Sequence, residues 1–155
     1  MQLTLIRHGE AKPPVSGNDI QRPLTNKGHL QAKETASFLK KIINQPDILI
    51  VSPLLRAQET LSYLEEIYPA VPIQICDFIK PDDDAGEAIE WLSNLTAENI
   101  VVVCHMNVIG YMDEKLTTNG SFHPFHLAEA RVYQQAVVAQ GLSTLTHSFI
   151  PQIGD

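Results

Sequence analysis

The sequence has few cysteines and no long apolar run. Of its 155 residues only Cys76 and Cys104 are cysteines, and each ends an apolar, strand-like run. Two cysteines in such runs are typical of small core residues in a reducing compartment, which argues against a disulfide framework. No stretch approaches the ~18 consecutive apolar residues of a transmembrane helix, so the pattern also argues against a membrane protein.

Basic residues are also scarce. The chain has 11 lysines and arginines against 18 aspartates and glutamates, which gives a formal net charge of −7. This sign of charge opposes broad, non-specific binding to nucleic acid or to anionic lipid. An anionic ligand would therefore need a local basic pocket. The first residues contain no basic leader and only a short apolar run, which does not fit a signal peptide, so a cytoplasmic location is expected.

Length and composition indicate one globular domain. The chain is 44% hydrophobic and 19% charged, and a chain of this length buries roughly 68 to 70% of its unfolded-state surface on folding. That burial is sufficient for one core without a metal or a disulfide. No repeat, low-complexity tract or linker divides the sequence, so a single domain is expected over residues 1–155.

Short apolar runs alternate with segments of helical periodicity. Strands are expected at residues 3–7, 48–51, 71–76 and 100–104, helices from about residues 26, 53, 85 and 106, and a hairpin within residues 128–150. Thr25 and Ser52 are expected to cap the first two helices, with Pro53 at the first helical position of the second. This alternation indicates βαβ units. We therefore predict an α/β three-layer sandwich with a mainly parallel central sheet, helices on both faces and the hairpin as an antiparallel edge.

Four side chains capable of chemistry follow the predicted strands. They are Arg7, His8, Arg56 and His105, and in such sheets ligands bind beyond the carboxyl ends of the strands. The planar donor fork of arginine matches phosphate oxygens, and near neutrality a histidine can be a neutral nucleophile or a charged donor. Gly9 allows close backbone approach beside His8. Together these residues predict a site for a phosphoryl group.

The segments that carry these residues resemble the histidine phosphatase (phosphoglycerate mutase-like) superfamily. They read LIRHGE at residues 5–10, RPLTNKG at 22–28, VSPLLRAQET at 51–60 and VCH at 103–105. Within the superfamily, the chain is similar to the SixA phosphohistidine phosphatase subgroup in its length and in the runs at residues 22–25, 52–57 and 105–111. The resemblance covers nearly the whole chain, and four ordered segments make it specific.

The resemblance implies a mechanism and gives each residue a role. His8 would attack phosphorus and form a phosphohistidine that water then hydrolyses. Arg7, Arg56 and His105 would hold the phosphoryl oxygens, and Arg22, on the adjoining loop, would help to bind phosphate. No metal and no other cofactor is expected, because phosphoryl transfer depends mainly on positioning and charge neutralisation.

The implied substrate is a phosphohistidine on a histidine-phosphotransfer domain or a phosphocarrier protein. Two alternatives stay open: a phosphatase for small phosphomonoesters, and a phosphate- or phosphoprotein-binding module with weak turnover. The connections after the strands are short, so a shallow, open site is expected, which would suit a protein substrate. Arg131, in the tail hairpin, is predicted to lie away from the site and to contribute nothing to phosphate binding.

The proton donor is the point at which the sequence departs from the superfamily. Many members place a glutamate just after the third strand, but this chain has none there. The carboxylates that could replace it are Asp77, Asp82, Asp83, Asp84 and Glu87. The sequence singles out none of them, and the three consecutive aspartates also suit the solvated start of a helix. A phosphohistidine phosphatase depends less on an enzymic acid, because a protonated imidazole is a good leaving group.

Overall fold

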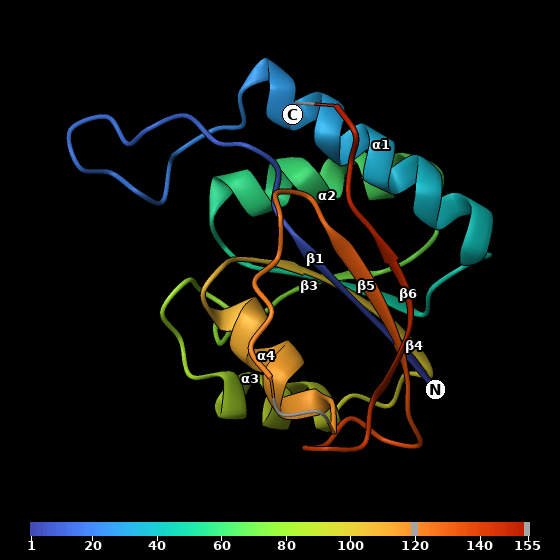
Figure 1. Cartoon of the computed structure of the whole chain (residues 1–155). Helices are drawn as coiled ribbons and strands as arrows, with labels where there is room; N and C mark the ends of the chain where they lie inside the picture. The colour runs from blue at the N-terminus through green and yellow to red at the C-terminus, as the bar shows by residue number, and fades with distance from the viewer. Residues whose placement is uncertain (119–120, 154–155) are drawn as a thin grey trace.

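Strands and helices alternate along the chain (Figure 1). The computed structural model describes residues 1–118 and 121–153. In chain order its elements are β1 (Gln2–Arg7), α1 (Asn26–Ile42), β2 (Ile48–Val51), α2 (Leu55–Ile67), β3 (Ile73–Ile75), α3 (Ala85–Ser93), β4 (Asn99–Cys104), α4 (Val108–Leu116), β5 (Ala130–Gln134) and β6 (Thr144–Phe149).

These strands form one sheet in the order β3-β2-β4-β1-β5-β6. The pairs β2·β3, β2·β4 and β1·β4 are parallel, whereas β5 pairs antiparallel with β1 and β6 pairs antiparallel with β5. The predicted α/β fold and its antiparallel C-terminal edge are therefore confirmed. Because β1 and β4 are adjacent and parallel, the segments that follow these two strands lie side by side.

The sheet separates two apolar cores, because successive residues of a strand point to opposite faces. Leu5 and Val102 pack on the face covered by α3 and α4. Their chain neighbours Ile6 and Val103 pack on the face covered by α1 and α2 (Figure 1). Burial of both faces explains why the central strands read as continuous apolar runs.

Both cysteines lie in the core as free thiols, as predicted. Burial raises the pKa of Cys76 and raises the pKa of Cys104 to about 12. Neither thiol is therefore ionised near neutral pH. In the part of the chain that the structure describes, no helix has the length and hydropathy needed to cross a membrane.

The predicted cap of α1 is confirmed. Thr25 Oγ1 accepts a hydrogen bond from the N–H of Gly28 at 3.0 Å. Asp84 caps α3 in the same way, because its Oδ1 accepts from the N–H of Glu87 at 3.1 Å. At least one of the three consecutive aspartates therefore serves the start of a helix.

The predicted cap of α2 is wrong. This helix begins at Leu55, with Leu54 at the N-cap position and no side-chain cap. The reason is that Ser52 is buried at the end of β2, where its Oγ accepts from the N–H of Leu54 at 3.2 Å and lies 2.7 Å from His105 Nε2. The serine hydroxyl is thus part of the neighbourhood of a candidate site residue.

Two other elements are shorter than predicted. β3 covers Ile73–Ile75 and not residues 71–76, and its three residues are exposed. α4 begins at Val108 rather than near residue 106, because the N–H groups of Val108 and of the residue before it both donate to the carbonyl of Pro81. The chain therefore leaves β4 in a turn before the helix starts.

Candidate active site

The site lies where β1 and β4 end. These parallel neighbours are in register with Arg7 opposite Cys104, and the N–H of His8 donates to the carbonyl of Cys104 at 3.1 Å. His8 and His105 therefore leave their strands together, with ring centroids 5.1 Å apart and ring planes at 57°. The structure brings together the two histidines that the sequence places at this edge.

A close contact between two glycines fixes the exit from β1. A Cβ atom on Gly9 would lie 2.5 Å from the carbonyl oxygen of Gly28, at the start of α1. A Cβ atom on Gly28 would overlap the carbonyl oxygen of Glu10. Backbone thus packs directly on backbone here, and any larger residue would displace the segment that carries His8.

The hydrogen bonds of His8 determine its tautomer. Its Nδ1 lies 2.7 Å from the carbonyl oxygen of Gly9, and since a carbonyl can only accept, Nδ1 carries the proton. Arg56 Nε donates to His8 Nε2 at 3.3 Å. Burial, with the charges of Arg56 and Arg7, lowers the pKa of His8 to about 3 despite the bond to Gly9. At neutral pH His8 is therefore a neutral imidazole with its lone pair on Nε2.

His105 is also a neutral imidazole. It is buried, and burial together with His8 and Arg56 lowers its pKa to about 2. Its Nε2 lies 2.7 Å from Ser52 Oγ. Its Nδ1 is buried without a hydrogen-bond partner in the described part of the chain. One ring nitrogen of His105 is therefore available to a ligand.

Two arginines join the histidines from different elements. Arg7, the last residue of β1, donates from Nη1 to the carbonyl of Phe125 at 2.8 Å. Its Nε is buried and lacks a hydrogen-bond partner among residues 1–118 and 121–153. Arg56 lies in the first turn of α2 and is 3% exposed. The four residues predicted to form the site thus come together at one edge of the sheet.

Asp19 is a member of this cluster that the sequence reasoning missed. Its Oδ2 lies 3.2 Å from Arg56 Nη2 and its Oδ1 lies 3.1 Å from Arg22 Nη1. Arg56 Nη1 also donates to the carbonyl of Asp19 at 2.8 Å. The hydrogen bond from Arg22 and the charge of Arg56 outweigh burial and lower the pKa of Asp19. A carboxylate three residues before a candidate phosphate-binding arginine was the available signal.

Arg22 lies at the base of the same loop. Its Nε donates to the carbonyl of Lys12 at 2.7 Å, so the residue closes the loop formed by residues 12–23. Through Asp19, Arg22 is connected to Arg56. Arg22 therefore lies beside the cluster. It stabilises the loop through its bond to Lys12, and it brings a positive charge close to the site.

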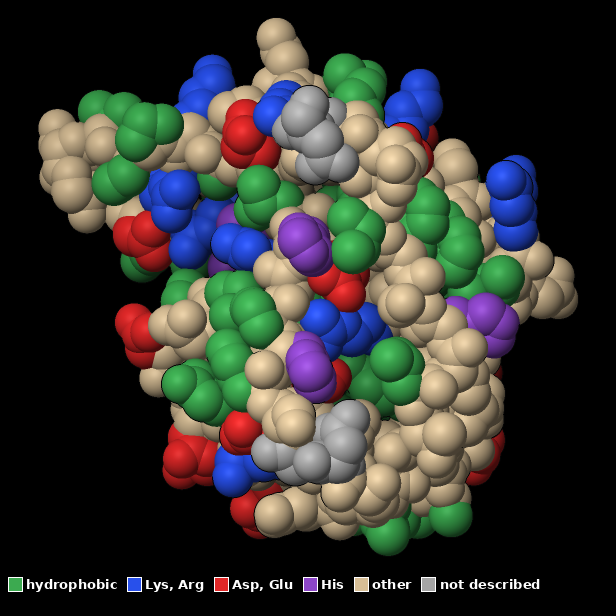
Figure 2. All heavy atoms as spheres, in the orientation of Figure 1, with side chains coloured by type: hydrophobic (Ala, Val, Ile, Leu, Met, Phe, Trp, Pro, Cys, Tyr) green, Lys and Arg blue, Asp and Glu red, His purple; other side chains and the backbone are tan. Residues whose placement is uncertain are grey.

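The expected open site is covered on one side. Residues 12–23 project from the body of the molecule (Figure 1), and Figure 2 shows arginine or lysine and histidine side chains gathered at the base of this projection. Asp19 in this loop contacts Arg56, and both histidines are buried: His8 is 7% and His105 0% exposed. A segment that the sequence indicated only as a loop thus contributes to the site.

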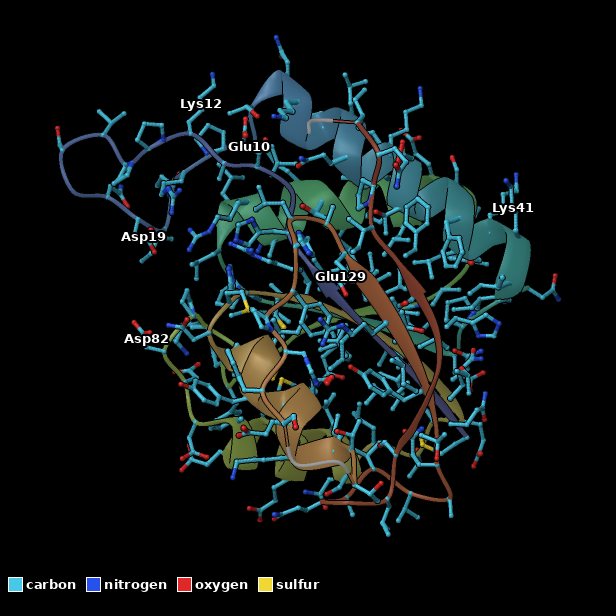
Figure 3. The ribbon with its side chains drawn as sticks, viewed as in Figure 1. Glu10, Lys12, Asp19, Lys41, Asp82 and Glu129 are labelled. Carbon is cyan, nitrogen blue, oxygen red and sulfur yellow. The ribbon has the colours of Figure 1, made fainter. Side chains whose placement is uncertain are left out.

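The structure distinguishes the carboxylates that were candidates for the proton donor. Asp84 caps α3, and Asp83 Oδ2 accepts from the N–H of Lys80 and lies 3.0 Å from its Nζ. Asp82 Oδ1 lies 3.4 Å from Asn107 Nδ2, two residues beyond His105. In Figure 3, Asp19 and Asp82 lie on the same side of the molecule. Among the predicted candidates for the proton donor, Asp82 therefore contacts a residue that closely follows His105.

A surface pocket begins at Arg7 and could hold the remainder of a ligand. Its volume is about 410 Å³, and it is lined by Arg7, Glu10, Gln31, Pro124, Phe125, His126, Leu127, Ile150 and Pro151. Within the described residues, no three histidine, cysteine, aspartate or glutamate side chains are grouped in a way that could hold a metal ion. The site therefore offers arginine and histidine donors beside a pocket lined by both polar and apolar side chains.

Two curated bacterial proteins are similar to this chain over most of its length. The phosphohistidine phosphatase SixA of Escherichia coli is 29% identical over 123 residues, which cover 75% of this chain and 74% of that protein. The SixA homologue of Haemophilus influenzae is 29% identical over 143 residues, covering 83% of this chain and 87% of that protein.

Structure comparison gives the same relationship for the fold. A solved structure of the protein histidine phosphatase SixA complexed with tungstate superposes with a TM-score of 0.86 over 97% of both chains, at 24% identity. Residues 3–80, half of the chain, match the family model described as the histidine phosphatase superfamily (branch 1). The chain therefore belongs to the histidine phosphatase superfamily and is similar to its SixA members.

Proposed function

We propose that this chain is a phosphatase that removes phosphoryl groups from phosphohistidine on a signalling or phosphocarrier protein, with His8 as the nucleophile. The observation that carries the proposal is the His8 ring, which is neutral and has its Nε2 lone pair directed at the Arg56 guanidinium. The similarity to two bacterial proteins, the phosphohistidine phosphatase SixA and a SixA homologue, supports the substrate class.

In the first step, His8 Nε2 attacks phosphorus while the P–N bond to the substrate imidazole breaks. The bonding electrons become the lone pair of the ring nitrogen that carried phosphorus, and the imidazole leaves neutral because its other nitrogen already carries a proton. The hydrogen bond from His8 Nδ1 to the carbonyl of Gly9 holds the ring at the attacking orientation. It also stabilises the positive charge that the ring acquires when phosphorus bonds to Nε2.

The unpaired donors of the site would hold the phosphoryl oxygens. Arg7 Nε and His105 Nδ1 are buried without partners in the described chain, and buried polar atoms rarely stay unpaired unless a ligand completes them. Ser52 Oγ accepts from the N–H of Leu54, so its hydroxyl hydrogen is free to bond His105 Nε2. That arrangement would leave the ring proton on Nδ1, ready to donate to phosphate.

In the second step, water attacks phosphorus and the P–N bond to His8 breaks. The electron pair returns to Nε2, phosphate leaves, and one proton of the water passes to solvent. His8 is then again the neutral tautomer of the free protein. Arg56, which bonds Nε2 in the free protein at 3.3 Å, would exchange this bond for a phosphoryl oxygen at each turnover.

Charge and shape favour a protein substrate over a small polyanion. The formal charge of −7 and the half-exposed Asp19 carboxylate repel highly charged metabolites such as bisphosphates. A side chain projecting from a protein surface can instead place its phosphoryl group at the arginines while the pocket beside Arg7 contacts the rest of the partner. Such remote contacts supply orientation and transition-state binding.

The test is a comparison of kcat/KM across substrates. The panel contains a phosphohistidine-bearing transfer domain, a phosphorylated phosphocarrier protein, sugar phosphates and bisphosphates, each at low and moderate salt. The proposal expects the phosphohistidine proteins to be the best substrates. It also expects activity to persist in the presence of a chelator, since the proposed steps use only side chains.

Other outcomes would favour the alternatives. A sugar phosphate that matches or exceeds the proteins would indicate a small-molecule phosphomonoesterase. A phosphoenzyme that forms but releases phosphate slowly would indicate a phosphate- or phosphoprotein-binding module. Loss of activity with the chelator would contradict the metal-independent mechanism.

A further inference from the structure

Arg131 is a buried residue of β5, in the C-terminal hairpin where the sequence placed it. Its Nε bonds Glu129 Oε2 at 2.7 Å and its Nη1 bonds Asp113 Oδ2 at 3.0 Å. All three side chains are less than one-tenth exposed. The strand β5 also pairs with β1, where Arg131 lies opposite Leu5, and this pairing is not evident from the sequence pattern.

The same guanidinium clamps the segment that precedes β5. Arg131 Nη1 donates to the carbonyl of His123 at 2.9 Å, and Nη2 donates to the carbonyl of Pro124 at 3.0 Å. The guanidinium carbon also lies 3.8 Å from the centroid of the Phe125 ring. Three consecutive residues outside regular structure are therefore held by one side chain.

This segment in turn holds Arg7. The carbonyl of Phe125 accepts from Arg7 Nη1 at 2.8 Å. Glu129 bonds both this segment and Arg7. Its Oε1 accepts from the N–H of His126 at 2.8 Å, and its carbonyl accepts from the N–H of Arg7 at 3.1 Å. Figure 3 shows Glu129 in the centre of the molecule, beside β1 and β5. A continuous set of contacts thus joins Arg131 to Arg7.

We infer that Arg131 is a positioning residue for the phosphate site: it fixes residues 123–125 so that the Phe125 carbonyl orients the Arg7 guanidinium toward the phosphoryl group. The inference rests on the proposed function only in that Arg7 binds phosphoryl oxygens. It does not depend on which phosphorylated molecule is the substrate.

The ion network formed by Arg131, Glu129 and Asp113 fits a role in positioning Arg7 better than a role in stability alone. Apolar side chains of similar volume generally stabilise a core as well as a buried ion network does, so stability alone does not require Arg131. What an apolar side chain cannot do is bond two successive carbonyls and an aromatic face at once. That directional contact sets where the next carbonyl, the partner of Arg7, lies.

The experiment measures anion affinity and folding separately. Calorimetric titration with tungstate and with inorganic phosphate, and melting temperatures, are recorded for wild type, Arg131→Met and Arg131→Lys. Arg131→Met is expected to weaken both anions by roughly ten- to a hundred-fold, the scale at which small displacements of a binding group act. Arg131→Lys keeps a charge and donors for one carbonyl, so it is expected to recover part of that loss.

Asp113→Asn is the matched control. Asp113 belongs to the same ion network, where it bonds Arg131 and the hydroxyl of Tyr133. The variant is expected to lower the melting temperature and to leave both anion affinities at the wild-type value. If Arg131→Met does not fold, the inference is tested by comparing the anion affinities of Arg131→Lys and Asp113→Asn.

One result would overturn the inference: both Arg131 variants lower the melting temperature while binding tungstate and phosphate as wild type does. Arg131 would then be structural only. Because the measurement uses simple anions, it stands even if the phosphohistidine proteins prove to be poor substrates. Loss of anion affinity in the Arg131 variants together with poor turnover of those proteins would support the inference and contradict the proposed function.

Discussion

Arg7 and Arg131 lie on neighbouring strands and are both largely buried, yet their surroundings differ. Arg131 bonds two carboxylates and two carbonyls and packs on an aromatic ring. Arg7 has a carbonyl acceptor on Nη1, and its Nε has no partner among the residues described. Burial lowers the pKa of Arg7, whereas at Arg131 the bond and charge of Glu129 outweigh burial and raise the pKa.

The difference separates two uses of a buried arginine. A guanidinium in which every nitrogen is hydrogen-bonded within the protein, as at Arg131, holds structure, and one with an unpaired buried nitrogen has capacity for a ligand. The unpaired ring nitrogen of His105 lies in the same cluster as Arg7. Two of the four buried side-chain atoms that lack a partner among the described residues, Arg7 Nε and His105 Nδ1, therefore lie where β1 and β4 end.

The largest effect is expected at His8. His8→Ala should fold and lose at least about a thousand-fold in turnover, because it removes the proposed nucleophile. Wild type should form an acid-labile, base-stable phosphoenzyme that the variant lacks. Rapid quenching with labelled substrate measures both quantities. Activity above a few per cent of wild type in His8→Ala would exclude His8 as the nucleophile.

The second prediction sets Arg56→Met against Arg131→Met. Arg56 is buried, but its ion-pair partner Asp19 is half exposed and stays solvated when the arginine is lost, so Arg56→Met should cost about 1 to 2 kcal/mol of unfolding free energy. Arg131→Met leaves two buried carboxylates without their cation and should cost about 3 to 5 kcal/mol. Urea unfolding of both variants measures the difference.

Anion binding should not follow the ranking of stability, because both variants are expected to weaken it. Arg56→Met is expected to weaken tungstate binding by roughly ten- to a hundred-fold, since one charge-assisted bond contributes about 1.5 to 3 kcal/mol. Equal losses of stability in the two variants would contradict the distinction between ligand-binding and structural arginines. Unchanged tungstate affinity in Arg56→Met would contradict the site itself.

The third prediction concerns pH and the two neutral histidines. Their folded-state pKa values are about 3 for His8 and about 2 for His105, below the unfolded value of about 6.5. The unfolded chain therefore binds more protons below pH 6.5, so stability is complete above that pH and falls as pH decreases toward 3. The slope should reach about 1.4 kcal/mol per pH unit for each histidine.

Single substitutions test this assignment. Unfolding free energies measured from pH 7.5 to 4.5 should depend less on pH in His8→Asn and in His105→Asn. Ser148→Ala, which changes an exposed position of β6 without removing a titratable group, should keep the wild-type slope. A wild-type slope in both of the first two variants would mean that these histidines are not the groups kept neutral by folding.

The smallest effect is expected at Asp19. Its carboxylate occupies the same arginine nitrogens of Arg22 and Arg56 that would bind phosphoryl oxygens. Asp19→Asn should therefore tighten tungstate and phosphate binding, by about two- to five-fold at low salt because the carboxylate is half exposed. The gain should shrink as salt increases. Weaker binding in the variant would mean that Asp19 holds Arg56 in place rather than competing with the anion.

The sequence predicted what depends on strand order. Arg7, His8 and His105 each lie at the end of an apolar run, and parallel strands carry such residues to one edge of the sheet. The cap at Thr25 and the terminal hairpin were predictable from local patterns as well. These features require only the identity of the elements and their direction.

The remaining features depend on contacts between distant segments. Ser52 matches a helix cap by local rules, but its hydroxyl bonds His105, which is 53 residues away in sequence. Asp19 reaches Arg56 from a loop whose path no periodicity describes. Arg131 carries no local signal for its network, which arises from the pairing of β5 with β1. Sequence patterns predict elements, whereas these roles arise from how the elements pack.

The pairing of β1 with β4 also sets the dimensions of the reaction centre. Adjacent strands of any sheet are about 4.7 to 4.9 Å apart, and the centroids of the two imidazoles, each one residue past its strand, are 5.1 Å apart. The separation of the rings is thus a property of backbone hydrogen bonding in the best-buried part of the molecule. Loops around the rim can vary in length and sequence without altering this spacing, so the shape of the neighbouring pocket can change while the separation of the two histidines stays the same.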